Sequence, residues 1–157
     1  YAKDARTASD LSFERQNGEL RKIYHGIVSG RPQASQGTLN YMLTHDPKKR
    51  RMRASSEGKP CVTDYRVLKE FEYYSLIEIT IHTGRTHQIR AGFTAFGYPL
   101  LGDAVYKGDR SFINRPGLHC AYLSLVHPRN EETLRITADY PPDMKRLLDE
   151  KTEDVFR

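Results

Sequence analysis

The sequence predicts an α+β fold, with a mostly antiparallel mixed sheet and a few flanking helices. Several runs alternate apolar and polar residues with a period of two, and short turns join them, which is typical of antiparallel strands. Other segments have helical spacing and end at glycine. No repeat, low-complexity tract or Pro/Gly-rich linker divides the 157 residues, so we expect one domain.

The elements can be justified in chain order. The first helix is expected over 7–15, with Ser9 or Asp10 near its start and Gly18 at its stop. Alternating or β-branched runs predict strands over 22–29, 37–43, 62–71, 75–82, 118–126 and 131–138. Two more helices are expected, over 86–96 with Gly97 as the residue that ends it, and over 143–150.

Composition excludes several classes of protein. The hydrophobic fraction is 38%, and no apolar stretch approaches the length of about 18 residues that a membrane span needs. The two cysteines, Cys61 and Cys120, are too few for a disulfide scaffold and lack C-x-x-C spacing, which favours a reducing compartment such as the cytoplasm. No signal segment opens the chain, which begins on Tyr1.

Most of the net charge lies in one polar segment. The chain carries 25 Lys and Arg against 20 Asp and Glu, a net charge of +5, and residues 44–60 alone contribute 6 − 2 = +4. We expect a loop or an exposed hairpin there, whose bases contact phosphates of a polyanion. The bases of interest are Lys48, Lys49, Arg50, Arg51 and Arg53. The alternative is a solvated loop without a partner.

The segment HTGRTHQIR, residues 82–90, is the richest in chemically active side chains. It joins a strand to a predicted helix start, and on a helix from Thr86 the side chains of His87 and Arg90 project from one face. Such an array can pair with a carboxylate or hold phosphates near the positive helix end. It is no Walker loop, because no G-K-[ST] follows Gly84. The alternative is an exposed basic helix start.

Other polar residues favour structural roles. Tyr24, in a strand, is by itself typical of core filling. Asp103 follows Leu101-Gly102 and is expected to be a buried acid that orients backbone N–H groups in a tight turn. His119 and His127 lie eight residues apart without a third ligand at fixed spacing, so we expect no metal site from them.

Five motifs in order give the chain a resemblance. They are RKIYHGIVSG (21–30), GKPCVTDYRVL (58–68), TGRTHQIR (83–90), GYPLLGDAVY (97–106) and LHCAYLSLVHP (118–128). In sequence, order and spacing they resemble the RluA-like family of RNA pseudouridine synthases, over almost the whole chain. The resemblance implies an isomerase that acts on RNA without metal or nucleotide cofactor, with ribosomal RNA ahead of transfer RNA as substrate.

The resemblance also implies roles for individual residues. Arg90 matches the family arginine that pairs with the catalytic aspartate, and Tyr24 matches the tyrosine that packs on the target uracil. Residues 83–88 match the segment that shapes the active-site floor, so we expect substrate contacts from Arg85, Thr86, His87 and Gln88. One departure concerns packing: the family often has His two residues after this arginine, where the chain has Gly92.

A second departure is the nucleophile. The family carries its catalytic aspartate in an H-R-L-D segment before the stretch that residue 1 resembles, and this chain has no such segment. We therefore expect residues 1–157 to be the C-terminal portion of a catalytic domain that is incomplete at its N-terminus and inactive alone. An exposed sheet edge would then favour self-association. The alternatives are a non-catalytic RNA-binding module and, less well supported, a metal-dependent hydrolase using His87, His119 and His127.

Overall fold

The computed structural model describes residues 2–149 and has the α+β architecture that the sequence predicts. In chain order, the elements are α1 (Ala5–Asn17), β1 (Arg21–Ser29), β2 (Gln36–Asp46), β3 (Arg51–Ala54), β4 (Lys59–Glu70), β5 (Tyr74–Ile81), α2 (Gln88–Ala95), the 3₁₀ turn η1 (Ala104–Tyr106), β6 (Leu118–Val126), β7 (Thr133–Thr137) and α3 (Pro142–Asp149).

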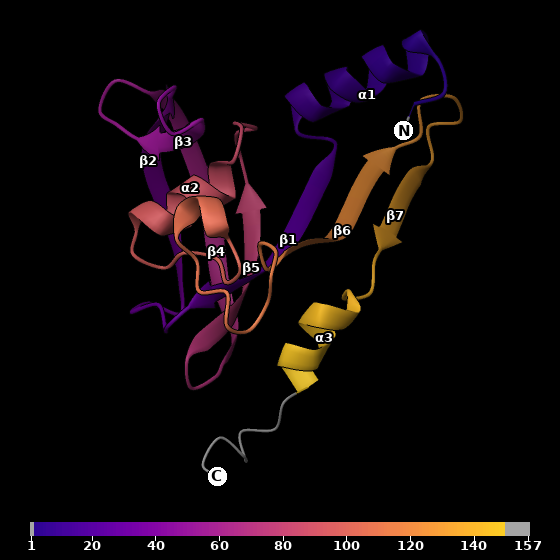
Figure 1. Ribbon diagram of the computed structural model, residues 1–157. Coiled ribbons are helices and arrows are strands. Elements are labelled where there is room, and N and C mark those ends of the chain that lie inside the picture. Colours follow the sequence, from indigo (N-terminus) through magenta and orange to yellow (C-terminus); the bar gives the residue numbers. More distant parts are fainter. Residues whose placement is uncertain (1, 150–157) are drawn as a thin grey trace.

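One seven-stranded sheet forms the body of the structure, in the order β3-β2-β4-β5-β1-β6-β7 (Figure 1). Its six strand pairings are all antiparallel. β1 lies between β5 and β6, and its pairing with β6 changes register between Ile23 and Tyr24. This irregularity lies at the tyrosine that the resemblance singles out, and β-bulges commonly re-aim a side chain next to a functional site.

Helices cover the two faces of the sheet at different places. Because side chains alternate along β5, Ile77 and Ile79 pack with Phe93 of α2 on one face. On the opposite face Leu76 packs with Met144 of α3. The core is thus split into clusters on either side of β5 and β1, and Figure 1 shows α2 over the half of the sheet that contains β2 and β4. Apolar clusters therefore pack on both faces of the sheet around β1, the strand that contains Tyr24.

The first helix starts earlier than expected. It begins at Ala5, and the N-cap is Asp4, whose carboxylate accepts from the Thr7 amide at 2.8 Å, so Ser9 and Asp10 lie inside the helix. The expected stop at Gly18 is confirmed, with a left-handed φ of 78°. The buried Glu14 carboxylate accepts from the Val126 amide of β6 at 3.1 Å, which fastens α1 to the sheet.

The remaining boundaries differ by a few residues. Residues 44–60 contain the end of β2, the whole of β3 and the start of β4. Of the loop and the exposed hairpin that the sequence allows, the structure has the hairpin, with Asp46 paired to Arg51 across its turn. The helix expected from residue 86 begins at Gln88, since His87 adopts left-handed backbone angles. The strand expected over 131–138 is shortened to Thr133–Thr137, and Glu131 has a positive φ in the preceding turn. Glu150, the expected end of the last helix, lies outside the described residues.

The outer strands of the described sheet are β3 and β7. On β7, Ile136 is 50% exposed, and every residue of β6 is half-buried, so this side of the sheet is thinly covered. Self-association through such an edge stays a prediction. Across residues 2–149, no helix is both long and apolar enough to cross a membrane.

Candidate active-site groove

An open groove of about 1300 Å³ lies where β1 begins and β5 ends. Its walls come from the α1–β1 connection, the two strand ends, the start of the HTGRTHQIR segment and the β6–β7 hairpin. The lining residues are Arg15, Gln16, Gly18, Glu19, Leu20, Arg21, Lys22, Ile23, Tyr24, Thr80, Ile81, His82, Thr83, Gly84, Arg85, Tyr122, Ser124 and Arg135. Tyr24 and Arg85, which the sequence singles out separately, thus meet in one cavity.

Tyr24 presents a half-buried ring to this groove. Its inner side packs against the cluster that contains Val28 and Ile79, which fixes the strand and the ring beside it. Burial raises the pKa of the Tyr24 hydroxyl, and Cys120 opposite it on β6 raises it further, so the hydroxyl is neutral at physiological pH. The ring is a flat apolar surface with a neutral hydroxyl, a suitable platform for an aromatic base.

The groove is basic, because cations from three separate segments converge on it. They are Arg15, Arg21, Lys22, Arg85 and Arg135, against the single carboxylate of Glu19 among the lining residues. The strand register explains part of this convergence: Ser124 of β6 pairs with Arg21 on one side and with Arg135 on the other, so the two arginines flank it in one row. Sequence reasoning missed four of these five cations, since no local charge run marks them.

Arg90 lies outside this lining, in a second polar cluster between α2 and η1. Its Nε and Nη2 donate to the two carboxylate oxygens of Asp103 at 2.7 and 2.8 Å, a bidentate pair. Asp103 is 0% exposed, and its carboxylate also accepts from the Tyr106 amide at 3.3 Å. The turn role expected for Asp103 is confirmed, but sequence reasoning sought the carboxylate partner of Arg90 outside the chain and missed this one.

This ion pair is electrostatically secured. The hydrogen bonds and charge of Asp103 raise the pKa of the Arg90 guanidinium, which stays charged at every relevant pH. The guanidinium carbon lies 5.1 Å from the centroid of the Tyr106 ring, within cation–π range. Arg90 is therefore held in place by Asp103 and is permanently charged.

The other residues of the HTGRTHQIR segment divide into two groups. Arg85 and Thr86 are exposed, so their expected substrate contacts stay predictions. His87 and Gln88 face inward: Gln88 is 3% exposed, accepts from the Thr83 hydroxyl and the Arg85 amide, and donates to Val62 and Thr63. The Gln88 amide thus holds the segment to β4 rather than facing the groove.

Gly92 explains how the chain packs without the family's histidine at that position. A Cβ at Gly92 would overlap the Tyr41 hydroxyl. That hydroxyl donates to the Gln88 carbonyl at 2.9 Å and lies 3.0 Å from the Thr63 hydroxyl, and burial raises its pKa to about 12. Tyr41 of β2 thereby occupies the space beside α2, which leaves no room for a side chain at position 92.

The basic hairpin lies at the opposite end of the sheet from β6 and β7 (Figure 1). Lys48, Lys49, Arg50 and Arg53 are exposed, as a phosphate contact requires. Arg51 is not: its Nη1 donates to the Val105 carbonyl at 2.9 Å, and its guanidinium lies 5.5 Å from the Tyr106 centroid. Arg51 therefore fastens the hairpin to η1, in contrast to the phosphate contact that the sequence predicts for it.

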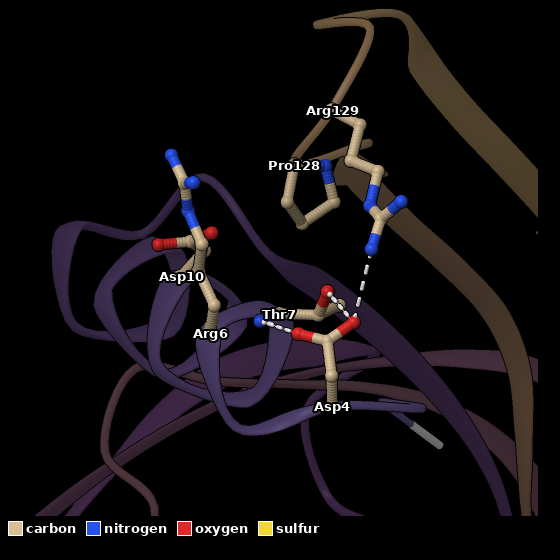
Figure 2. A pocket seen from close by; sticks show the side chains of 6 residues that line it. All are labelled: Asp4, Arg6, Thr7, Asp10, Pro128 and Arg129. Atoms are coloured by element: carbon tan, nitrogen blue, oxygen red, sulfur yellow. Dashed lines mark hydrogen bonds and ion pairs between the residues drawn. The ribbon is translucent and has the colours of Figure 1, made fainter.

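A smaller hollow lies at the start of α1, and some of the residues that line it contact one another. Figure 2 shows the Asp4 carboxylate between Thr7 and Arg129, whose Nη2 donates to it at 3.2 Å. The hollow ties α1 to the β6–β7 turn. Elsewhere in residues 2–149, no three His, Cys, Asp or Glu side chains gather to hold a metal ion, so the hydrolase alternative has no ligand set there.

Comparisons with known proteins agree on one family. The model of the family described as RNA pseudouridylate synthase matches residues 1–95. An uncharacterized RNA pseudouridine synthase of Chloroflexus aurantiacus is 43% identical over 88% of this chain and 44% of its own length. The ribosomal large subunit pseudouridine synthase D of Buchnera aphidicola is 35% identical, covering 82% of this chain and 45% of the relative.

Solved structures agree as well. The human RNA pseudouridylate synthase domain containing 1 superposes with a TM-score of 0.76 at 26% identity, covering 91% of this chain and 64% of that one. The chain spans about half the length of the curated relatives it matches.

Proposed function

Since the chain belongs to the RNA pseudouridylate synthase family, we propose that the protein containing it converts uridine to pseudouridine in structured RNA. The observation that supports this most directly is the basic groove beside the half-buried Tyr24 ring. The reaction breaks the N1–C1′ bond, turns the uracil and joins C5 to C1′; the proton on C5 leaves and N1 takes up a proton. It needs a flipped base, a platform for it and a charged anchor for the backbone.

In this proposal the groove provides the platform and the anchor. Stacking of the flipped uracil on Tyr24 is worth about 1–3 kcal/mol. The cations around it neutralise phosphates on either side of the flipped nucleotide and release counterions. The resemblance to the family would also give the Tyr24 hydroxyl a part in the removal of the C5 proton.

The nucleophile in this proposal would be the family's aspartate, in an H-R-L-D segment that residues 1–157 do not contain. Arg90 would keep that carboxylate ionised through charge and hydrogen bonds. Contacts with Asp103 and His87 engage three of the five N–H groups of Arg90 within the part of the chain described, which leaves donors for a second carboxylate. Asp4 caps α1 and pairs with Arg129, so it has a structural role.

Ribosomal RNA of the large subunit is the proposed substrate, with transfer RNA as the alternative. The name of the Buchnera relative, ribosomal large subunit pseudouridine synthase D, supports the first. We also propose a reducing, cytoplasmic setting, which is compatible with the free cysteines Cys61 and Cys120.

Substitutions of Tyr24 test the platform. Tyr24→Ala should weaken RNA binding by about 1–3 kcal/mol, because the stacking surface is lost. Tyr24→Phe should bind RNA like the wild type, since the ring remains. The measurement is filter binding of the full-length protein to its RNA, together with the rate of pseudouridine formation. A Tyr24→Ala variant with unchanged affinity would exclude stacking, and the rate of Tyr24→Phe reports whether the hydroxyl takes part.

Neutralising the hairpin cations tests whether the hairpin contacts phosphates. A variant with Lys48→Gln, Lys49→Gln and Arg50→Gln should lower the slope of log affinity against log salt by about 2, since each phosphate contact releases counterions. The control is a triple variant of exposed cations elsewhere, Lys3→Gln, Arg110→Gln and Lys145→Gln, with the same change in charge. Equal slopes in the two triple variants would mean that the hairpin is solvated and does not contact phosphates.

A further inference from the structure

His87 adopts a backbone conformation that its surroundings must hold. Its φ of 53° and ψ of 24° lie in the left-handed region, which residues other than glycine rarely adopt. The residue is half-buried, directly before the first residue of α2, and its own side chain does not cap the helix. The imidazole is therefore free to serve another purpose in the cluster around Arg90.

Hydrogen bonds determine the protonation of that imidazole. Nη1 of Arg90 lies 3.0 Å from Nε2 of His87. A guanidinium can only donate, so Nε2 must be an unprotonated acceptor. The neutral ring then carries its proton on Nδ1, which lies 3.1 Å from the Tyr106 hydroxyl and donates to it.

The same hydroxyl reaches the basic hairpin. It accepts from the amide of Met52, on β3, at 3.0 Å, and Tyr106 itself is 2% exposed. A continuous path of hydrogen bonds therefore runs from β3 through Tyr106 and His87 to Arg90. Arg51, beside Met52, packs on the same tyrosine ring.

We propose that His87 is a positioning residue, a neutral imidazole protonated on Nδ1 that fixes the rotation of the Arg90 guanidinium and connects it through Tyr106 to the basic hairpin. Asp103 accepts hydrogen bonds from Nε and Nη2 of the guanidinium, and His87 accepts one from Nη1. The catalytic consequence rests on the proposed function; the protonation state does not.

Protonation of His87 would disrupt this arrangement. A proton on Nε2 would face the donating Nη1 of Arg90, and the new cation would lie among Arg90 and, across Tyr106, Arg51, with Asp103 as the opposing charge. Burial first, and then Arg90, lower the pKa of His87, while Asp103 raises it. Because the folded pKa lies below the ordinary 6.5, the stabilisation is present above pH 6.5 and is lost as the pH falls through the folded pKa.

Nuclear magnetic resonance of the full-length protein with ¹⁵N-labelled histidine tests the protonation state. The His87 signals are assigned as those lost in His87→Gln. At pH 7 we expect Nδ1 protonated and Nε2 unprotonated, and titration should give a pKa below that of a free histidine. A protonated Nε2 at pH 7 would overturn the proposal whether or not the protein modifies RNA.

Kinetics of the same protein test the positioning role. His87→Leu removes both hydrogen bonds and should lower kcat by about 100-fold with KM for RNA unchanged, as expected when a catalytic group is misplaced. In the wild type, protonation of His87 should lower the rate at acidic pH, below pH 6.5. His87→Gln can accept from Arg90 and donate to Tyr106, so it should restore most of kcat and should not show this fall in rate. The control is His45→Gln, an exposed histidine on β2.

Three kinetic results would contradict the proposal. The first is a His87→Leu variant altered in KM alone, which would make His87 an RNA contact. The second is a His87→Gln variant whose rate falls at acidic pH as that of the wild type does, which is the acid limb of the pH–rate profile. The third is a His45→Gln variant that loses that limb. If the resonance result agrees but the full-length wild type forms no pseudouridine, the proposed function fails and the positioning of Arg90 stands.

Discussion

Replacing Arg90 by alanine is expected to lower the free energy of unfolding by about 3–5 kcal/mol, because it leaves a buried carboxylate without its cation. Asp103 is 0% exposed, and its carboxylate accepts hydrogen bonds from both Nε and Nη2 of the guanidinium. Without them, the backbone amide of Tyr106 at 3.3 Å is a weak substitute. The measurement is urea unfolding followed by circular dichroism at neutral pH.

The matched control is Arg66→Ala. Arg66 also pairs with a carboxylate, Glu78, at 3.0 Å, but its side chain is 59% exposed. Pairs of this kind contribute about 0–1 kcal/mol. A double variant, Arg90→Met with Asp103→Asn, should be more stable than Arg90→Ala, since the unpaired charge is gone. Equal losses in Arg90→Ala and Arg66→Ala would contradict a buried, mutually dependent pair.

Substitution of Gly102 by alanine should be the most damaging change at a glycine. Gly102 has a φ of 73°, and a Cβ there would overlap the carbonyl oxygens of Arg115 and Ile113, which belong to the backbone and cannot turn aside. Left-handed strain costs about 1–2 kcal/mol. Overpacking adds about 1–3 kcal/mol. Gly102 directly precedes Asp103, so the substitution should also weaken the ion pair between Asp103 and Arg90.

Gly30→Ala separates the two costs. Gly30 has a nearly identical φ of 72°, but nothing lies within 4 Å of a Cβ built on it. It should therefore lose only the conformational part, about 1–2 kcal/mol. Thermal unfolding of both variants gives the comparison. If Gly102→Ala is no less stable than Gly30→Ala, overlap of the added Cβ with the 113–115 backbone does not destabilise the protein.

The strands and the ends of the helices were predictable because their causes are local. Alternation along residues 75–81 gives a strand with two apolar faces, and Gly18 and Gly97 end helices wherever a left-handed residue is required. The start of α2 was not predictable, since the left-handed angles of His87 depend on Arg90 and Tyr106, which meet it only in the folded chain.

The same distinction applies to the site. The segment around Arg90 and the strand position of Tyr24 stand out in the sequence as motifs. The pairing of Arg90 with Asp103 spans 13 residues and the row of Arg21, Ser124 and Arg135 crosses three strands, so neither leaves a pattern in a short window. The inward turn of Arg51, among four exposed bases, depends on the Tyr106 ring, which lies 55 positions later in the sequence.

Release of tritium from RNA labelled at uracil C5 tests the central claim most directly. The full-length protein should release tritium from large-subunit ribosomal RNA taken from cells that lack its gene. Arg90→Lys keeps the charge but loses the planar fork, so it should lower the rate by about 100-fold or more with unchanged RNA affinity. The 157-residue chain alone should release none. Release by Arg90→Lys at the wild-type rate would contradict the assigned role of Arg90, and RNA binding without release by the full-length protein would favour a non-catalytic module.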